Sequence, residues 1–246
     1  MLGKCFPRVS QQNHLSLTTR DMIDVIFEDN HLLVLNKPPL IATMGAQTGA
    51  PSLLEDAKNY LKQKYNKPGN VYLGVVSRLD AFVSGAIVFA RTSKSASRLS
   101  DQFRRRKITK QYRAIIPSGV LRNTGVLEDW IYKDDASHRM RCSDNADHPA
   151  AKLGRLTYEV IGRHQNGDFD LLNINLETGR KHQIRVQLAH AGSPIVGDRK
   201  YESRDPFAKG IALHCFHLAL EHPTLKKKIE FTVEPPKHWR LDKFDV

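Results

Sequence analysis

Short runs of β-type residues, separated by turn residues, recur along almost the whole chain, and this pattern most limits the folds open to it. Strands are expected over residues 24–27, 31–35, 85–90, 110–117, 126–132, 155–161, 169–176, 211–218 and 228–233. The strands and helices do not alternate regularly. The pattern therefore predicts an α+β fold around a mostly antiparallel sheet, with flanking helices, rather than a parallel βαβ fold.

Three stretches have the periodicity of amphipathic helices. The expected helices cover about residues 53–65, 94–106 and 181–191. Ser52, Ser93 and Thr178 are the expected N-caps, and Gly192 is placed to end the third helix. The polar stretch 134–151 is expected to be a loop.

The composition supports one folded unit of ordinary size. Hydrophobic residues make up 40% of the 246 residues, which is enough for a substantial core and excludes a disordered or fibrous chain. Residues 1–20 are polar and are expected to form a tail, while residues 21–246 are expected to form a single domain. No apolar run approaches the length of about 20 residues that a membrane-spanning helix needs, so no membrane partner is expected.

The cysteines and the N-terminal residues bear on the compartment. Cys5, Cys142 and Cys215 are far apart and odd in number, so they form neither a disulfide framework nor the spacing of a zinc site. Free thiols are typical of a reducing compartment. The first twenty residues lack the apolar segment of a secretory signal, and an organellar transit peptide is the less favoured alternative. We expect a cytoplasmic protein that acts as a monomer.

Positive charge is in excess and is concentrated in one part of the chain. The protein has 38 Lys and Arg residues against 26 Asp and Glu residues, a formal net charge of +12. Residues 91–127 hold ten cationic side chains and one acid, Asp101. Such a block is either a solvated basic face or a track that binds phosphates by releasing counterions, and the basic balance of the whole chain favours the track. Arg104, Arg105 and Arg106 are its expected phosphate contacts.

One acidic residue stands among apolar neighbours in residues 77–85. Asp80 follows Leu79 and precedes the apolar run 85–90, and Arg78 lies two positions earlier. A carboxylate is rarely buried without a partner, so Asp80 is expected at the edge of a cleft beside a cation. An Asx-type turn before the strand is the simpler alternative.

A second polar segment opens the third predicted helix. Arg180, His182 and Gln183 are expected on its first turn, where helix N-termini face ligands and anions. Arg180 is the expected partner of a carboxylate, because a guanidinium placed beside a carboxylate favours the ionised form.

His214 and His217, with Cys215 between them, invite interpretation as a metal site. On a strand the two histidines point to opposite faces, and the sequence shows no third ligand, so no metal is expected. His214 is instead expected in the core or beside the site, and Cys215 is expected to be a buried thiol.

The segments around Asp80 and Arg180 belong to a wider set of motifs. These are Arg78-Leu79-Asp80 with Ser84-Gly85, Tyr112 within residues 110–114, and residues 178–185, with further matches at Leu35-Asn36-Lys37-Pro38, Gly197-Asp198, Tyr201, Leu213-His214 and His222-Pro223. In this order, from about residue 24 to residue 239, the motifs resemble those of the RluA-type pseudouridine synthases.

The resemblance implies an isomerase that converts uridine to its C-glycoside within structured RNA, either rRNA or tRNA, without metal or organic cofactor. By position, Asp80 would be the catalytic carboxylate, Tyr112 would stack near the target base and act in proton transfer, and Arg180 would pair with Asp80. Arg78 would help to displace the base from its stack, and Leu213 would pack against the flipped base. The other expected substrate contacts are His182, Gln183, Arg185, Arg104, Arg105 and Arg106.

Two positions depart from the family pattern. Ser77 stands where the family usually has histidine, and Val83 stands where it usually has threonine. Neither departure removes the catalytic candidates, so both bear on RNA specificity rather than on chemistry. Many relatives also carry a small RNA-binding module before the catalytic part. Since the strand pattern begins near residue 24, no such module is expected.

Two other functions are open. A non-catalytic RNA-binding or ribosome-assembly protein could share the fold, but binding alone does not need the Asp80, Tyr112 and Arg180 set. A nucleic-acid glycosidase is the second alternative. Glycosidases usually need two carboxylates, and no acid near Asp80 in the sequence is an obvious partner.

Overall fold

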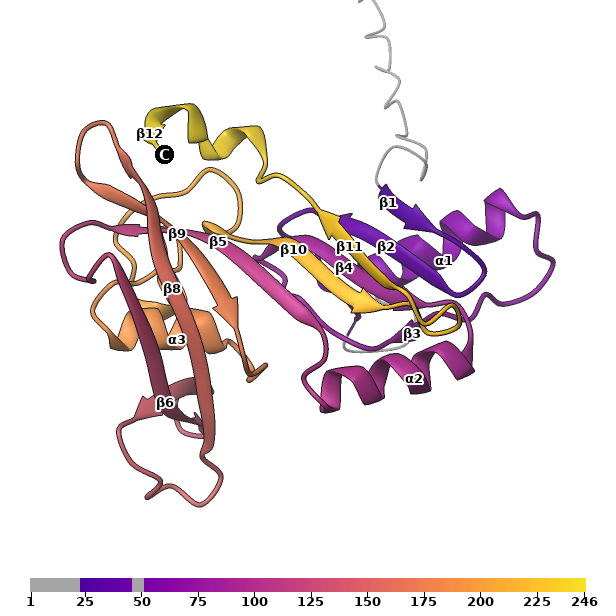
Figure 1. Cartoon of the computed structure of the whole chain (residues 1–246), viewed down its shortest axis with the longest axis horizontal. Helices are drawn as coiled ribbons and strands as arrows, with labels where there is room; N and C mark the ends of the chain where they lie inside the picture. Colours follow the sequence, from indigo (N-terminus) through magenta and orange to yellow (C-terminus); the bar gives the residue numbers. More distant parts are fainter. Residues whose placement is uncertain (1–22, 46–50) are drawn as a thin grey trace, which may run out of the picture.

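The computed structural model describes residues 23–45 and 51–246, and Figure 1 shows the course of the chain. The polar tail expected over residues 1–20 lies outside the described residues.

The described residues contain twelve strands in one mixed sheet. They are β1 (Asp24–Glu28), β2 (Leu32–Lys37), β3 (Gly74–Val75), β4 (Ser84–Ala90), β5 (Thr109–Pro117), β6 (Thr124–Asp134), β7 (Arg139–Ser143), β8 (Lys152–His164), β9 (Phe169–Leu176), β10 (Leu213–Glu221), β11 (Lys228–Thr232) and β12 (Phe244–Asp245). The main order is β1-β2-β4-β10-β5-β9-β8-β6-β7, with β3 also on β4, β11 on β10 and β12 on β8. Only the β4–β10 pair is parallel among the described strands, so the predicted α+β fold with a mostly antiparallel sheet is confirmed.

Three α-helices flank this sheet in the described part of the chain. They are α1 (Leu53–Lys64), α2 (Ser93–Arg104) and α3 (Gln183–His190), and three single-turn 3-10 helices follow, η2 (Arg199–Tyr201), η3 (Lys237–Trp239) and η4 (Leu241–Lys243). Figure 1 shows α1 and α2 around the strands β2 and β4, and α3 beside β8 and β9 in the other half. None of the described helices is long and apolar enough to cross a membrane.

Strands β2 and β4 are buried on both faces, because each face is covered by a helix. Leu33 and Leu35 of β2 belong to the same core cluster as α1, whereas Leu32 and Val34 belong to the cluster that contains Leu99 of α2. The sequence of a strand covered in this way is a continuous apolar run and does not alternate between apolar and polar residues. Strand β4 is also buried along its whole length.

Strand β10 joins the two halves of the sheet. It runs parallel to β4 and antiparallel to β5, and its far end pairs with β11. Gly85 makes the β4 contact possible: its φ is +116°, and a Cβ at this position would lie 2.3 Å from the carbonyl oxygen of Cys215. Only glycine fits there.

Two predicted helix ends are confirmed, and the predicted start of α2 is wrong. The backbone N–H of Glu55 donates to the Ser52 hydroxyl, and Gly192 follows α3 with a φ of +81°, as expected for a C-terminal glycine. Helix α2, however, is capped by Thr92, whose hydroxyl accepts from the N–H of Ser95 at 3.1 Å. Ser93 is the first helical residue.

The loop expected over residues 134–151 contains a strand, β7, which pairs with the end of β6. This strand, with the sequence Arg-Met-Arg-Cys-Ser, is half-buried at most, so it lacks the apolar signal on which strand prediction depends. The two-residue strands β3 and β12 were also not predicted.

Candidate active site

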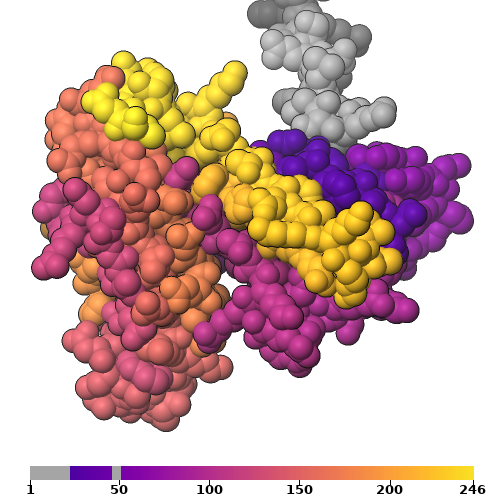
Figure 2. Space-filling model, viewed as in Figure 1, coloured from indigo at the N-terminus to yellow at the C-terminus, as the bar shows by residue number. Residues whose placement is uncertain are grey.

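A cleft of about 1200 Å³ opens between the two halves of the sheet. Its walls come from the loop before β4, from the end of α2 with the start of β5, and from the end of β9 with the start of α3. Figure 2 shows the surface hollowed between the part that carries α2 and the part that carries β6 and β8. Segments far apart in the sequence therefore meet at one site.

Asp80 lies in the loop before β4, and its side chain is 30% exposed in the cleft. Nη1 of Arg185 donates to Asp80 Oδ2 at 3.1 Å. The same guanidinium donates to both carboxylate oxygens of the buried Asp198, at 2.7 and 2.8 Å. These bonds raise the pKa of Arg185 against the opposing effect of its burial. Arg185 is thus a fixed cation that holds the Asp80 carboxylate in the cleft.

The expected pairing of Arg180 with Asp80 is wrong. Arg180 lines the cleft, but its Nε donates to the carbonyl oxygen of Leu153 at 3.0 Å. The cause is the helix start: α3 begins at Gln183, with His182 in a left-handed conformation before it, so Arg180 lies in the preceding turn. Arg185, which was predicted to contact substrate, is the partner of Asp80.

The predicted cap of α3 is also wrong, because Thr178 and Gln183 brace the turn instead. The Thr178 hydroxyl donates to Gln183 Oε1 at 2.7 Å, and the same oxygen accepts from the N–H of Arg180 at 3.0 Å. Gln183 Nε2 donates to the carbonyl of Arg155. With its polar atoms engaged and only 3% of its surface exposed, Gln183 shapes the cleft wall rather than offering groups to a substrate.

His182 lies beside Asp80 without an ion pair at neutral pH. Burial lowers the pKa of His182 to about 4, although the nearby Asp80 acts in the opposite direction. The Tyr201 hydroxyl lies 2.8 Å from His182 Nδ1, and burial raises the pKa of Tyr201 to about 12. The imidazole is therefore hydrogen-bonded to Tyr201 through Nδ1, and its other nitrogen, Nε2, lies 3.7 Å from Asp80 Oδ2.

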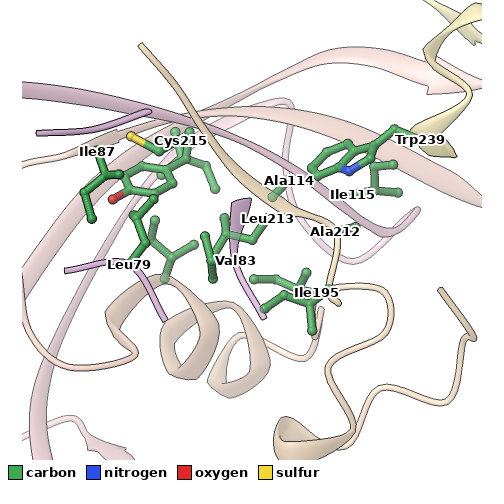
Figure 3. Close-up of a cluster of buried hydrophobic side chains, with 14 of the residues drawn as sticks. Leu79, Val83, Ile87, Ala114, Ile115, Ile195, Ala212, Leu213, Cys215 and Trp239 are labelled. Atoms are coloured by element: carbon green, nitrogen blue, oxygen red, sulfur yellow. The ribbon is translucent and has the colours of Figure 1, made fainter. Parts of the chain in front are cut away.

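Tyr112, on β5, lines the cleft with only 4% of its surface exposed. Burial raises the pKa of Tyr112, and interactions with Cys215 and Asp80 raise it further. Leu213 also lines the cleft, and its side chain packs in the core near Val83 and Ala114 (Figure 3). Together these side chains make an apolar floor, as a flat base would require.

The segment that follows β2 holds the backbone on both sides of Asp80. The buried Thr43 hydroxyl donates to the carbonyl of Leu79 at 2.8 Å and accepts from the N–H of Leu79 at 3.1 Å. After Asp80, the Ala81 carbonyl accepts from the N–H of Leu40 at 2.8 Å and from Lys37 Nζ at 3.1 Å. Asp80 therefore projects from a loop that is pinned at its two neighbours.

Lys37 is completely buried among backbone oxygens. Its Nζ also donates to the carbonyls of Pro38 and Ile41, at 2.9 and 2.8 Å. Burial lowers the pKa of Lys37 to about 7, and the charge of Asp80 opposes the shift. Three carbonyl acceptors match the three N–H donors of the protonated amine, which makes Lys37 the centre of the loop that supports Asp80.

The predicted basic contacts fall into two groups. Arg78 is exposed and lines the cleft, as do Arg104 and Arg106 at the end of α2. Arg105 is exposed beside them and pairs with Asp101 at 2.9 Å, as Arg104 also does. Other cations of the same sequence block have structural partners: Arg91 pairs with Glu28 and Arg113 stacks on Phe216.

The histidines considered as metal ligands have other roles. His214 is fully buried, with Nδ1 2.8 Å from the Ser84 hydroxyl and Nε2 2.9 Å from the carbonyl oxygen of Val233, so its predicted core location is confirmed. Burial lowers the pKa of His214 to about 4. His217 lies beside Thr232 instead. Among the described residues, one group could hold a metal by geometry, Asp129, Asp144 and His190, and it lies outside the cleft.

Sequence reasoning gave no role to three residues of this site: Asp198, Lys37 and Thr43. Lys37 and Asp198 belong to motifs that the sequence shows, but their partners are distant in the chain. The available signal for Asp198 is an acid directly after the apolar residues Ile195 and Val196 and Gly197, which is compatible with burial beside a cation. Thr43 had no signal.

The chain matches a known family model over most of this region. Residues 31–190 match the model described as RNA pseudouridylate synthase. The ribosomal large subunit pseudouridine synthase D of Pasteurella multocida is 30% identical, over 87% of this chain and 68% of that protein. The chain belongs to the RluA-type RNA pseudouridine synthases. It is therefore an isomerase by class, as the resemblance implied.

Other RNA pseudouridine synthases agree in sequence and in fold. An uncharacterised member from Bacillus subtilis is 33% identical over 82% of this chain and 65% of its own length. The solved structure of human RNA pseudouridylate synthase domain containing 4 superposes with a TM-score of 0.73, over 91% of this chain and 94% of that chain, at 22% identity. The structure of human RNA pseudouridylate synthase domain containing 1 superposes with a TM-score of 0.70, over 87% of this chain and 84% of that chain, at 23% identity. These two likenesses confirm the pseudouridine synthase fold.

Proposed function

We propose that this RNA pseudouridine synthase isomerises a uridine in structured ribosomal or transfer RNA, with Asp80 as the catalytic carboxylate. The observation that carries the proposal is the Asp80 side chain, which is exposed in the cleft and held by the buried Arg185. Ribosomal RNA is the favoured substrate, because relatives in Pasteurella multocida and Rickettsia typhi are named ribosomal large subunit pseudouridine synthases D and C.

The reaction explains why an ionised carboxylate is needed. The bond between C1′ and N1 breaks, the uracil turns, and C5 bonds to C1′. C5 then loses its proton and N1 gains one, so that the product is an isomer of the substrate. A carboxylate acts here as a nucleophile or as a counter-charge to a cationic sugar, and a protonated acid does neither. Arg185 places a permanent cation 3.1 Å from the Asp80 carboxylate and holds it in the cleft where the reaction takes place.

Tyr112 is the proposed proton-transfer group and part of the surface on which the base stacks. It is a protonated phenol at rest, since burial raises its pKa. It therefore takes up a proton only in exchange for the one that it holds. Its position on the cleft floor, with Leu213, suits contact with the flat face of a flipped uracil.

Access to the base is the proposed role of Arg78. A uridine in a stem must leave the stack before its C1′ can be reached, at a cost of about a few kcal/mol. Arg78 is exposed, lies two positions before Asp80 and lines the same cleft. It can occupy the space that the base leaves, while the arginines at the end of α2 hold nearby phosphates.

The test is the Asp80→Asn variant, with Asp135→Asn as a control because Asp135 is exposed in the turn after β6. Pseudouridine formation is measured by mass spectrometry on RNA from a strain that lacks the gene, which also identifies the target. We expect Asp80→Asn to abolish turnover while RNA binding and the control activity stay intact. Appreciable turnover by Asp80→Asn would contradict the assignment, and release of free uracil by the wild type would favour a glycosidase.

A further inference from the structure

A second cleft, of about 650 Å³, lies beside α2, where this helix meets the turn between β10 and β11. We call it the basic groove. Its cationic residues are Arg98, Arg104, Lys107 and Lys226, and its acids are Asp101 and Glu221. The tip of the β10–β11 hairpin lies over α2 in Figure 1.

Hydrogen bonds fix the two walls of the basic groove relative to each other. The Gln102 side chain donates to the carbonyl of Glu221 at 2.7 Å and accepts from its N–H at 3.0 Å. Arg98 donates to the carbonyl of Pro223 at 2.8 Å. Because these bonds tie the helix to the turn, the groove exists before a ligand binds, and little free energy is lost in ordering it.

The charges of the basic groove do not cancel. Asp101 pairs with Arg104, and Glu221 lies 3.3 Å from Lys226. Within the described ranges, no carboxylate lies at ion-pair distance from Arg98 or Lys107. Lys107 is also exposed. The groove therefore keeps an excess of positive charge for an anionic ligand.

The types of side chain distinguish a paired nucleic acid from other anions. Every residue that lines the basic groove is polar or charged, and none is aromatic. Protein interfaces usually have an apolar core, and unpaired bases usually stack on aromatic rings, so neither kind of partner finds its usual contacts. Ser97 and Ser100 instead add hydroxyl groups of the kind that bind phosphate oxygens and sugars.

Arg104 connects the basic groove to the active site, because it lines both clefts. We propose that the groove holds the sugar-phosphate backbone of a base-paired RNA stem that continues from the target uridine. It adds affinity without base selectivity, and it makes binding depend on the length of the stem. This inference rests on the proposed function, which supplies the RNA at the neighbouring cleft.

The test compares Lys107→Ala/Lys226→Ala with a matched control, Lys237→Ala/Lys243→Ala. The control removes the same charge from the C-terminal 3-10 turns, which lie away from α2 (Figure 1). The probes are two fluorescent RNA hairpins with the same uridine-containing loop, one with a stem too short to leave the active-site cleft and one with a long stem. Dissociation constants are measured over a range of salt concentrations.

We expect the groove variant to bind the long-stem hairpin more weakly and to flatten its log–log salt dependence by about 1. This is less than two full phosphate contacts would give, because Glu221 already neutralises part of the Lys226 charge. The short-stem hairpin and the control should behave as with the wild type. An unchanged long-stem slope would overturn the proposal, and so would equal losses on both hairpins. Weaker binding of polyglutamate with unchanged binding of the long stem would indicate an acidic protein partner and would also overturn it.

These outcomes are separate from those of the proposed function. Binding slopes need no turnover, so they report on the basic groove even in a protein that forms no pseudouridine. Conversely, if the wild type forms pseudouridine but the groove variant keeps the wild-type salt slope on the long-stem hairpin, only the proposed role of the basic groove is contradicted.

Discussion

At the scale of single residues, the site depends on one guanidinium shared by two carboxylates. Arg185 contacts Asp80 through Nη1 and Asp198 through Nε and Nη2. Two donors fix the rigid guanidinium on Asp198, so the third holds the Asp80 carboxylate in a set position, which a flexible ammonium cannot do. Arg180, in contrast, makes one bond to a main-chain carbonyl.

Substitution of these two arginines should separate their roles. Arg185→Lys keeps one charge but cannot bridge both carboxylates, so we expect kcat to fall by about 100-fold, the loss typical of a displaced catalytic group. The free energy of unfolding should also fall, by about 3 kcal/mol, because Asp198 loses its buried partner. Arg180→Gln should change kcat little. Steady-state kinetics would measure kcat, and urea unfolding would measure the free energy of unfolding. A larger loss of kcat in Arg180→Gln than in Arg185→Lys would contradict the pairing of Arg185 with Asp80.

Thr43 is expected to position Asp80 through the backbone of Leu79. Thr43→Val keeps the side-chain shape and removes both hydrogen bonds, so kcat should fall by about tenfold or more with KM little changed. Thr43→Ser keeps the hydroxyl and should restore kcat even if it lowers the melting temperature. If both variants lose stability and activity in parallel, Thr43 acts only in folding.

For single residues, the sequence predicts which side chains carry the chemistry. It predicts less well which of these side chains contact one another. Asp80 was expected at a cleft edge beside a cation, and it lies there. The cation was expected at Arg180, because Thr178 was read as the helix cap. The helix starts at Gln183 instead, after a left-handed residue that no local pattern signals. Contacts such as Arg185 with Asp198 depend on tertiary packing, which residue spacing alone does not specify.

At the scale of elements, the parallel contact between β4 and β10 decides whether the cleft forms. It places the loop that carries Asp80 beside Leu213 and next to β5, which carries Tyr112. Long apolar runs predicted both strands. The order of the strands could not be predicted, since β4 and β10 are more than a hundred residues apart. The one trace of their pairing in the sequence is the glycine at position 85, which the close approach to Cys215 requires.

Gly85→Ala should therefore be among the most damaging small substitutions. The added Cβ would lie 2.3 Å from a backbone oxygen, and the φ of +116° disfavours any side chain. We expect a loss of at least about 4 kcal/mol in the free energy of unfolding. Gly119→Ala is the control, since it also has a positive φ, +83°, but has open space around it. Equal effects in urea unfolding would show that strain, rather than the close contact, matters at Gly85.

At the scale of the whole molecule, the net charge of +12 is not one continuous binding track. Part of the basic block supports the fold, as Arg91 does by pairing with Glu28. The arginines at the end of α2 are exposed, and two of them share Asp101. The overall charge thus predicts attraction to RNA. In the structure, some of the cationic side chains stabilise the fold and others are exposed and free to contact RNA.

Replacement of Arg104, Arg105 and Arg106 together by alanine should weaken RNA binding and flatten its log–log salt dependence by about 2. The change is smaller than three full contacts would give, because Asp101 already neutralises part of this charge. A fluorescence titration over a range of salt concentrations measures the slope. An unchanged slope would show that these arginines do not touch phosphate.

The segments that form the walls of the active-site cleft are carried by one unbroken ladder of strands, from β2 through β4, β10 and β5 to β9. A rotation of the two halves of the sheet toward each other, which would close the cleft, would strain or break backbone hydrogen bonds along this ladder. The ladder thus disfavours closure of the cleft, and we expect the shape change on binding to occur in the RNA. A target is then favoured by how easily its backbone bends and its base swings out, so uridines in loops, bulges and weak stems have an energetic advantage before any base is read.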